Sequence, residues 1–207
     1  MNVIEKTLKS IYHETGYYKK KLSRINEEKK LRSDAESKYN LEMVDKYFGG
    51  KTVVQNGPFS GIEYISSSSG SALLPKLLGS YEEPINDWIE EVIASKYDAI
   101  LDVGCAEGYY AVGFATRMPS SYIYAYDINS TAIEKAKSLA KVNNVKNISF
   151  SNECDWFELN KRVSSTRNIL LFCDIEGAEK ELLDIEKCES LKYIDIILES
   201  HDCFIPG

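Results

Sequence analysis

The stretch Leu101-Asp102-Val103-Gly104-Cys105-Ala106-Glu107-Gly108 decides the fold class of this 207-residue chain. It ends a short apolar run, residues 99–103, in a turn with two glycines, and the pattern predicts a helix over about residues 107–118. An apolar run that enters a glycine turn and then a helix is typical of a buried parallel strand in a βαβ unit. The N–H groups and the positive dipole end at the start of that helix favour ligand binding beside the turn.

The same pattern of strand and helix recurs along the rest of the chain. Each expected strand is apolar throughout, which predicts burial on both faces and therefore a parallel sheet. Further strands are expected at residues 122–126, 148–151, 169–173 and 194–199, and helices at about residues 84–95, 130–143 and 178–184. The predicted fold class is α/β, a Rossmann-like, mostly parallel sheet flanked by helices over residues 81–207.

Two segments precede the expected sheet. Residues 1–48 hold no proline and one glycine and are rich in Lys, Glu, Leu and Arg, so they are predicted to form an N-terminal helical arm. Residues 49–80 are expected to form a lead-in of two short strands, at residues 51–55 and 61–66, and a serine-rich loop.

The net charge of −7 is unevenly distributed. Residues 1–50 carry 11 Lys or Arg against 8 Asp or Glu, a net of +3, whereas residues 51–207 carry 14 against 24, a net of −10. A domain this acidic repels polyanions, which disfavours nucleic acid as a partner. No apolar run approaches the roughly 18 residues of a membrane span, so no membrane partner is expected. A homodimer through the arm or the sheet edge is the protein partner left open.

The five cysteines indicate reduced thiols. Their number is odd and they form no C-x-x-C pair, which argues against a zinc site and against a disulfide framework. The first residues lack the apolar region of a secretory signal. Together these features predict a cytoplasmic protein.

The glycine turn and a later aspartate together suggest the ligand. The spacing G-x-x-x-G differs from the G-x-G-x-x-G that a dinucleotide pyrophosphate favours, so an NAD site is disfavoured. Asp127 directly follows the second expected strand, 25 residues beyond Asp102, where a carboxylate can accept both hydroxyls of a ribose. A plain turn with glycines for geometry, and an aspartate that caps a helix, are the purely structural alternatives.

Four ordered motifs resemble those of one enzyme family. Asp102–Tyr110 with Asp127 is similar to the S-adenosylmethionine signature of the class I methyltransferases. Asp174-Ile175-Glu176-Gly177-Ala178-Glu179 and Glu199-Ser200-His201-Asp202 resemble the D-x-E-G-x-E and E-x-H motifs of the FkbM-type branch, and the lead-in around Gly57–Gly61 and Leu78–Glu82 fits it too. The resemblance covers about residues 57–207. It implies the class I fold and S-adenosylmethionine as the cofactor.

The resemblance also implies which residues bind that cofactor. It places the glycine turn along the methionine part, with Asp102 as its support. It also places Asp127 on the ribose, Ile128 on the adenine, and an acid or amide after the third strand near the adenine amino group, a position for which Glu153, Cys154 and Asp155 compete. The implied cofactor residues are Asp102, Gly104, Cys105, Ala106, Gly108, Asp127, Ile128, Cys154 and Asp155.

Catalysis is expected at the ends of the fourth and fifth strands. By resemblance, Asp174 faces the sulfonium and the acceptor. His201 follows the fifth strand with acids on both sides, at Glu199 and Asp202, and a histidine held by a carboxylate is suited to remove a proton from a hydroxyl near neutral pH. A histidine that only caps the strand end is the alternative.

A divalent cation is a second chemical possibility at these strand ends. Asp174, Glu176, Glu199, His201 and Asp202 could converge there, and hard oxygen ligands suit Mg²⁺ or Ca²⁺. The helix dipole alone also explains acids such as Glu176 and Glu179 at a helix start.

The predicted function is S-adenosylmethionine-dependent methyl transfer, with a small-molecule or sugar hydroxyl as the acceptor. The alternatives are a non-catalytic Rossmann-fold binding module and, less favoured by the glycine spacing, an NAD-dependent oxidoreductase. Because the class I fold adds a helix and an antiparallel strand pair after the fifth strand, the expected core lacks its last two strands, and the native chain is expected to continue past Gly207.

Overall fold

The computed structural model describes residues 16–66 and 72–201. The chain divides into two compact units, residues 1–51 and 52–207. The predictions for residues 1–15 of the arm, for most of the serine-rich loop and for Asp202 lie outside the described residues.

The described part of the first unit is one long helix. Helix α2 spans Gly16–Phe48, as the arm prediction requires for these residues. Its described side chains are nearly all exposed, which agrees with the polar composition of the segment. Among the described residues, no helix combines the length and the apolar character needed to cross a membrane.

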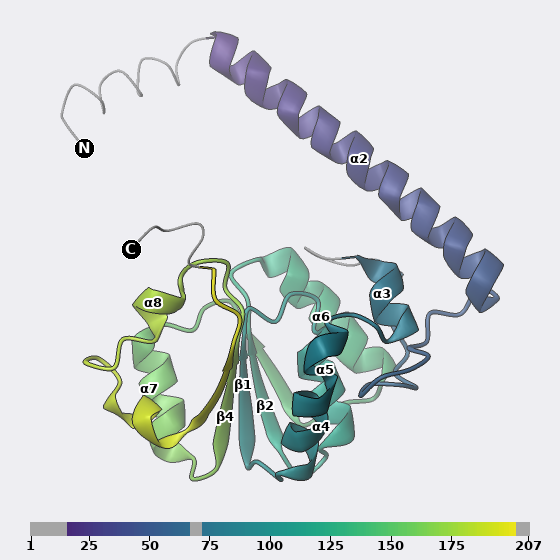
Figure 1. Ribbon diagram of the computed structural model, residues 1–207. Helices are drawn as coiled ribbons and strands as arrows, with labels where there is room; N and C mark the ends of the chain where they lie inside the picture. Colours follow the sequence, from purple (N-terminus) through teal and green to yellow (C-terminus); the bar gives the residue numbers. More distant parts are fainter. Residues whose placement is uncertain (1–15, 67–71, 202–207) are drawn as a thin grey trace. The chain divides into compact units, whose positions relative to one another are not determined.

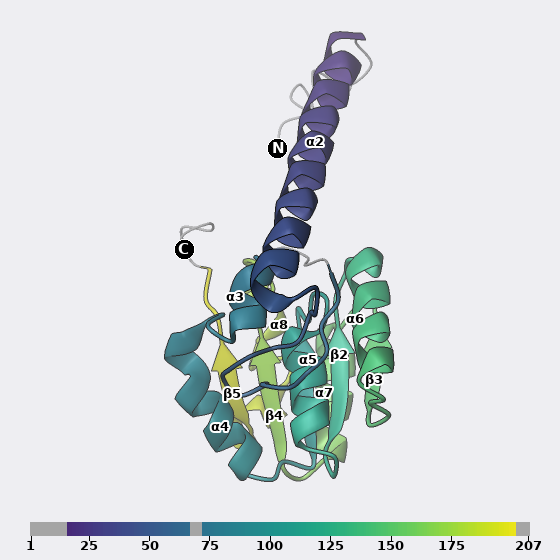
Figure 2. The same ribbon diagram turned by 90° about the vertical axis from the view of Figure 1, so that its right-hand side faces the viewer.

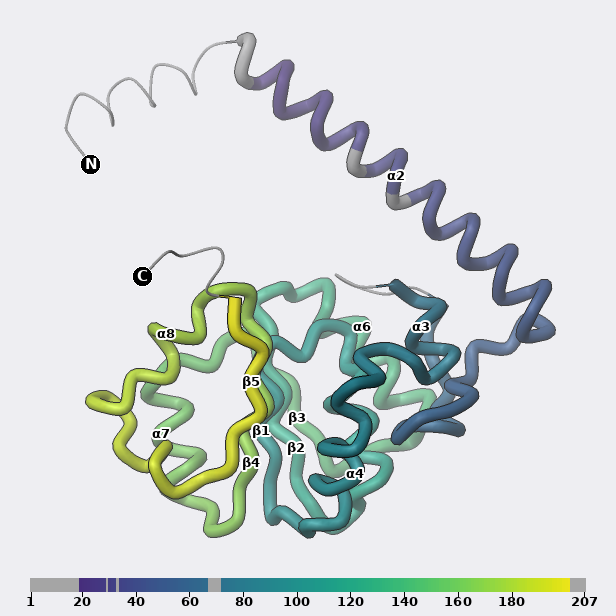
Figure 3. The backbone as a smooth tube through the Cα atoms, in the orientation of Figure 1, coloured from purple at the N-terminus to yellow at the C-terminus, as the bar shows by residue number. Residues whose placement is uncertain are grey.

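The second unit is built on a five-stranded parallel sheet, which confirms the predicted fold class (Figure 1). The strand order β3-β2-β1-β4-β5 is the doubly wound order of Rossmann-like folds. All strands run in the same direction, so their carboxyl ends share one edge of the sheet. Figure 3 traces the path of the chain through these strands. The strands are β1 (Ala99–Val103), β2 (Tyr122–Tyr126), β3 (Ile148–Ser151), β4 (Ile169–Cys173) and β5 (Asp195–Leu198).

Helices cover both faces of this sheet. Helices α4, α5 and α6 lie on one face, and α7 and α8 lie on the other (Figures 1 and 2). The helices of this unit are α3 (Leu73–Leu78), α4 (Asn86–Ala94), α5 (Tyr109–Arg117), α6 (Ser130–Val142), α7 (Trp156–Ser165) and α8 (Glu179–Leu182), with 3-10 turns η1 (Glu83–Ile85) and η2 (Glu189–Tyr193).

Two helices were not predicted from the sequence. Helix α7 has a mostly polar sequence, but its start carries a recognisable signal, because the Asp155 carboxylate accepts a hydrogen bond from the backbone N–H of Glu158. An Asp three residues before a Glu is the pattern of a capping box. Helix α3 has only six residues and contains Pro75, so neither its length nor its composition marks it.

Two strand predictions need correction. The two lead-in strands reduce to a single antiparallel bridge between Val53 and Glu63. Burial on both faces holds for β1 and β4, holds only in part for the interior strand β2, and fails for the edge strands β3 and β5. Ile196 and Leu198 of β5 are 40% and 43% exposed, because among the described residues β5 pairs with β4 alone.

The turn after β1 lies directly against the end of β4. Gly104 has a φ of +91°, and a Cβ atom at this position would lie 1.6 Å from the backbone oxygen of Asp174. The turn is also tied to both neighbouring strands, since Asp174 N donates to Val103 O and Gly104 N donates to Tyr126 O, each at 2.9 Å. Only glycine permits this approach of the two chain segments.

Replacement of Gly104 is therefore expected to destabilise the second unit. Gly104→Ala should lower the free energy of unfolding by about 3 kcal/mol or more, because it adds a steric clash to a strained backbone conformation. Gly61→Ala is the matched control: φ there is +90°, but nothing lies within 4 Å of the added Cβ. It should cost only about 1 kcal/mol. Urea unfolding followed by circular dichroism measures both, and equal losses would contradict the close-approach argument.

A charged residue is buried within β1. Asp102 is 2% exposed, and its Oδ2 has no hydrogen-bond partner among the described residues. Burial, followed by the charges of Asp174 and Asp127, raises the pKa of Asp102 to about 8. The folded protein therefore favours the protonated carboxyl over much of the neutral range.

This burial predicts a particular dependence of stability on pH. Since the folded pKa lies above the unfolded value of 3.8, the contribution of Asp102 is complete below about pH 4 and is lost as the pH rises towards 8. Asp102→Asn cannot ionise, so it should be more stable than the parent protein at pH 8, by about 1 kcal/mol or more, and the advantage should shrink at pH 5. Asp98→Asn, at an exposed position, is the control. An advantage for Asp102→Asn that is equal at both pH values would contradict the assignment.

Candidate active site

A pocket opens at the carboxyl edge of the sheet. Its volume is about 550 Å³, within the range of pockets that hold small molecules. The loops after β1, β2, β3 and β4 supply most of its wall, and residues near α3 and the start of α5 complete it. Ligands of doubly wound folds bind at this edge, in the crevice where the strand order reverses.

All but one of the predicted cofactor residues contribute to this wall. Those that do are Asp102, Gly104, Cys105, Ala106, Asp127, Ile128, Cys154 and Asp155. Gly108 is the predicted cofactor residue that does not line the pocket. It faces α6 instead, where a Cβ on Gly108 would lie 3.1 Å from the Cβ of Ala136. The role of Gly108 in the structure is to let α5 begin close to α6.

Asp127 holds two turns together at the pocket. Its Oδ2 accepts a hydrogen bond from Ala106 N at 2.8 Å, and its Oδ1 accepts one from Asn129 N at 2.7 Å. The alternative that Asp127 caps helix α6 is not what the structure shows, because Asn129 is the N-cap and accepts from Thr131 N. Asp127 thus places a carboxylate beside the glycine turn, as ribose binding requires.

One end of the pocket is formed by Ile128, which follows β2, and by the loop between β3 and α7, which ends at Trp156. Ile128 is 89% exposed and Trp156 is 45% exposed, and both line the pocket. Large apolar side chains exposed at a pocket mouth are available to pack on a flat ring. Trp156 was not predicted as a site residue, because the loop after the third strand could not be aligned with the family motifs.

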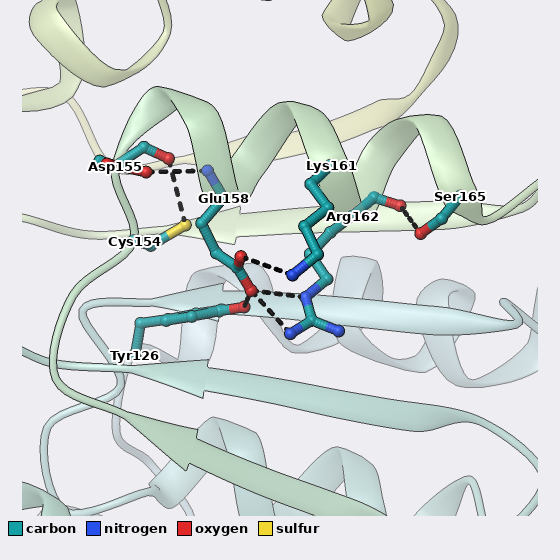
Figure 4. A network of polar contacts seen from close by, with 7 residues as sticks. All are labelled: Tyr126, Cys154, Asp155, Glu158, Lys161, Arg162 and Ser165. Carbon is teal, nitrogen blue, oxygen red and sulfur yellow. Dashed lines mark hydrogen bonds and ion pairs between the residues drawn. The ribbon is translucent and has the colours of Figure 1, made fainter.

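A network of polar contacts fixes this loop (Figure 4). The Glu158 carboxylate accepts hydrogen bonds from Arg162 Nε at 2.7 Å, from Tyr126 Oη at 3.2 Å and from Lys161 Nζ at 3.4 Å. Burial raises the pKa of the Cys154 thiol to about 12, so this sulfur stays protonated and is no nucleophile. Asp155 is occupied as the N-cap of α7.

The predicted catalytic residues meet at the ends of β4 and β5. His201 Nδ1 lies 3.1 Å from Glu179 Oε1, and His201 Nε2 lies 3.8 Å from Asp174 Oδ1 and 3.6 Å from Glu199 Oε1. Asp174 lines the pocket, whereas His201 and Glu199 are not among the lining residues. The nearest carboxylate to the histidine is Glu179, and not its sequence neighbour Glu199.

These groups shift each other's charge states. Burial, followed by the charge of Glu199, raises the pKa of Asp174 to about 6, although the charge of His201 acts in the opposite direction. Burial lowers the pKa of His201, but the hydrogen bond with Glu179 and the charges of Asp174 and Glu176 outweigh burial, so the net pKa is raised. The cluster therefore combines a histidine that favours its cationic form with a carboxylate that titrates close to neutral pH.

The pocket has the charge pattern that a sulfonium cofactor requires. Among the described residues, the buried side-chain oxygens without a hydrogen-bond partner are Asp102 Oδ2 and Asp174 Oδ1, and both residues line the pocket. Asp102 is largely protonated near neutral pH, so the negative charge here is mainly that of Asp174. A buried carboxylate oxygen without a hydrogen-bond partner is costly unless a cation or a donor meets it. The residues present thus fit a positively charged ligand such as S-adenosylmethionine.

A divalent cation is also chemically compatible with the cluster. One ligand atom from each of Asp174, Glu176 and His201 lies within 4.8 Å of the others. The protonated imidazole of His201 supplies positive charge to the same carboxylates, so the cluster does not require an ion. Metal binding stays a prediction.

Sequence reasoning missed a buried ion pair on the opposite side of the pocket. Lys76 Nζ donates to Glu107 Oε1 at 2.6 Å, and Tyr64 Oη donates to the same oxygen at 2.7 Å. Glu107 is 0% and Lys76 is 2% exposed. Burial lowers the pKa of Lys76, and Glu107 acts in the opposite direction. The 31 residues between the partners leave no local pattern from which this pair could be read.

Part of the chain matches a known family. Residues 94–180 match a family model described as "Methyltransferase domain". Over 60 residues the chain is 37% identical to the release factor glutamine methyltransferase of Aliivibrio fischeri (strain ATCC 700601 / ES114). The aligned stretch covers 29% of this chain and 21% of that protein. The chain therefore aligns with only a small share of this curated relative.

Two solved structures show weaker likeness. The tRNA (uracil-54, C5)-methyltransferase of Pyrococcus abyssi, in complex with S-adenosyl-L-homocysteine, is 19% identical with a TM-score of 0.44, over 66% of this chain and 32% of that chain. An rRNA methylase from Streptococcus thermophilus is 17% identical with a TM-score of 0.43, over 59% and 76%. Similarities of this size establish neither a substrate nor a reaction. By sequence, residues 94–180, which contain the glycine turn, β2, β3, α7 and β4, are similar to a methyltransferase domain.

Proposed function

We propose that the second unit binds S-adenosylmethionine and transfers its methyl group to a hydroxyl of a small molecule or sugar. The observation that carries this proposal is the pair of buried carboxyl oxygens without a hydrogen-bond partner, on Asp102 and Asp174, in a pocket whose glycine turn lies within the methyltransferase-domain match. When bound, the cofactor supplies an activated methyl group on a cationic sulfur. The protein then has to align the acceptor, keep water out and remove a proton.

Asp174 is the residue best placed to remove that proton. It lines the pocket, its Oδ1 is unpartnered among the described residues, and its pKa of about 6 suits a base at neutral pH. His201 lies behind it, held by Glu179, and its positive charge sets how readily Asp174 ionises. In this proposal the proton of the acceptor hydroxyl passes to Asp174. His201 positions Asp174, and Glu199 Oε1 lies 3.6 Å from His201 Nε2.

The wall near Asp174 supports a small neutral acceptor. Tyr81, Tyr110 and Phe172 line this part of the pocket, and Tyr110 Oη donates to Glu82 Oε2 at 2.5 Å. Aromatic faces beside carboxylates suit a sugar or small polyol, and the acidic surroundings disfavour phosphorylated and other anionic acceptors. The FkbM-type motifs point in the same direction. A cytoplasmic location and a homodimer stay predictions.

Calorimetry with two ligands tests the cofactor assignment. S-adenosylhomocysteine should bind the full chain at least about tenfold more tightly than NAD, because the glycine turn lacks the pyrophosphate spacing. Tighter binding of NAD would favour an oxidoreductase instead. Binding of S-adenosylhomocysteine, without methyl transfer from S-adenosylmethionine to any of a panel of sugars and small alcohols, would favour the non-catalytic binding module.

The role of His201 predicts a shift in the pH profile. His201→Gln should reduce methyl transfer about a hundredfold and leave the affinity for S-adenosylhomocysteine unchanged. Because His201 lowers the pKa of Asp174, the rise of activity with pH should move to higher pH in this variant. Tyr193→Phe, at an 80% exposed position, is the control. An unshifted profile would contradict the pairing, and loss of parent activity in EDTA, restored by Mg²⁺, would assign the cluster to a cation.

A further inference from the structure

The wall of the pocket has one positive side chain among many negative ones. Besides Asp102, which is largely protonated near neutral pH, its acidic side chains are Asp127, Glu153, Asp155, Asp174, Glu176 and Glu181. Among the described residues that line the pocket, Lys76 is the single lysine or arginine. An anionic group that enters this pocket is therefore repelled along most of the wall and attracted at one position.

Lys76 is held in place from several directions. It belongs to α3, which precedes the methyltransferase-domain match, yet its ammonium donates to Glu107, which directly follows Ala106 in the glycine turn. The same ammonium lies 4.7 Å from the centroid of the Tyr81 ring and 5.6 Å from that of the Tyr109 ring. These contacts fix the position of a positive charge beside the turn that is expected to carry the methionine part of the cofactor.

Packing alone gives a poor reason to keep this lysine. A buried ion pair can usually be replaced by apolar side chains of similar volume without loss of stability. Lys76 is 2% exposed, and lysines are almost never so completely buried unless they are paired. The feature that an apolar pair would not reproduce is a positive charge at the pocket wall.

We propose that Lys76 binds the α-carboxylate of S-adenosylmethionine, an inference that rests on the proposed function. The cofactor carries a sulfonium, an ammonium and a carboxylate, so the carboxylate is its only anionic group. Lys76 is the position on the wall that attracts it, and the many carboxylates elsewhere match the two cationic groups. This contact orients the methionine part towards α3 while Asp127 receives the ribose.

Two ligands that differ by one group provide the test. S-adenosylhomocysteine has the carboxylate, and S-adenosyl-3-thiopropylamine lacks it but keeps the ammonium and the adenosine. By calorimetry on the full chain, the parent protein should prefer S-adenosylhomocysteine by about tenfold to a hundredfold, the range expected for a charge-assisted contact. Equal affinity of the parent protein for the two ligands would overturn the proposal without any variant.

A matched pair of variants assigns the preference to Lys76. Lys76→Met alone would remove the ammonium that pairs with the buried carboxylate of Glu107. The comparison is therefore between Glu107→Gln and the double variant Lys76→Met/Glu107→Gln, which differ only at Lys76. The first should keep the preference for S-adenosylhomocysteine, and the second should bind both ligands equally. Lys137→Met, at an exposed lysine of α6, controls for the loss of one positive charge.

The outcomes separate this inference from the proposed function. If the double variant is folded by circular dichroism and keeps the full preference, Lys76 is not the carboxylate site, while cofactor binding stands. If the folded parent protein binds neither ligand, the proposed function fails and the inference fails with it.

Discussion

The approach of the Asp174 backbone to Gly104 is the constraint on which the rest of the site depends. A side chain at position 104 would occupy the place of the Asp174 carbonyl, so the turn after β1 and the end of β4 can meet only at a glycine. This approach brings the carboxyl group of Asp174 close enough to Asp102 for its charge to add to the effect of burial, the larger cause of the raised pKa of Asp102. A structural requirement of the sheet thus creates a concentration of negative charge at its carboxyl edge.

That concentration of charge is costly in the absence of a positive partner. Two carboxylate oxygens remain without a hydrogen bond among the described residues, and one carboxyl is held largely protonated by burial. The carboxylates at the ends of β4 and β5 are balanced by His201, whose imidazole faces Asp174, Glu176, Glu179 and Glu199. Asp102, within β1, has an oxygen without a hydrogen-bond partner among the described residues, and a cationic ligand in the pocket would stabilise its ionised form. Sites that store this kind of electrostatic strain are often functional ones.

The sequence predicts the sheet well because each strand is an uninterrupted apolar run that ends at a turn signal. Prediction fails where a role depends on distant residues. Gly108 faces α6, and no local pattern indicates the close helix packing that it permits. Glu179, and not the adjacent Glu199, is nearest to His201, because the start of α8 lies closer to the imidazole than the end of β5 does. Helix α7 is a different case, because the sequence contains the capping signal of Asp155 and Glu158 at its start. The mostly polar composition of the segment outweighs that signal, so the helix was not predicted.

The lead-in segment is the part of the fold whose importance the sequence least reveals. Its strands are reduced to one bridge, yet Tyr64 and Lys76 reach the buried carboxylate of Glu107 and anchor the segment to the glycine turn. Because one oxygen of Glu107 accepts from both, a displacement of the lead-in would break two hydrogen bonds to a buried charge. The segment is therefore tied to the glycine turn by side-chain hydrogen bonds, where a strand would use backbone ones. The wall near Tyr81 and Lys76, which lies outside residues 94–180, is thereby attached to the part of the pocket inside them. In the proposed function, the cofactor and the acceptor therefore meet a wall that the methyltransferase-domain match includes only in part.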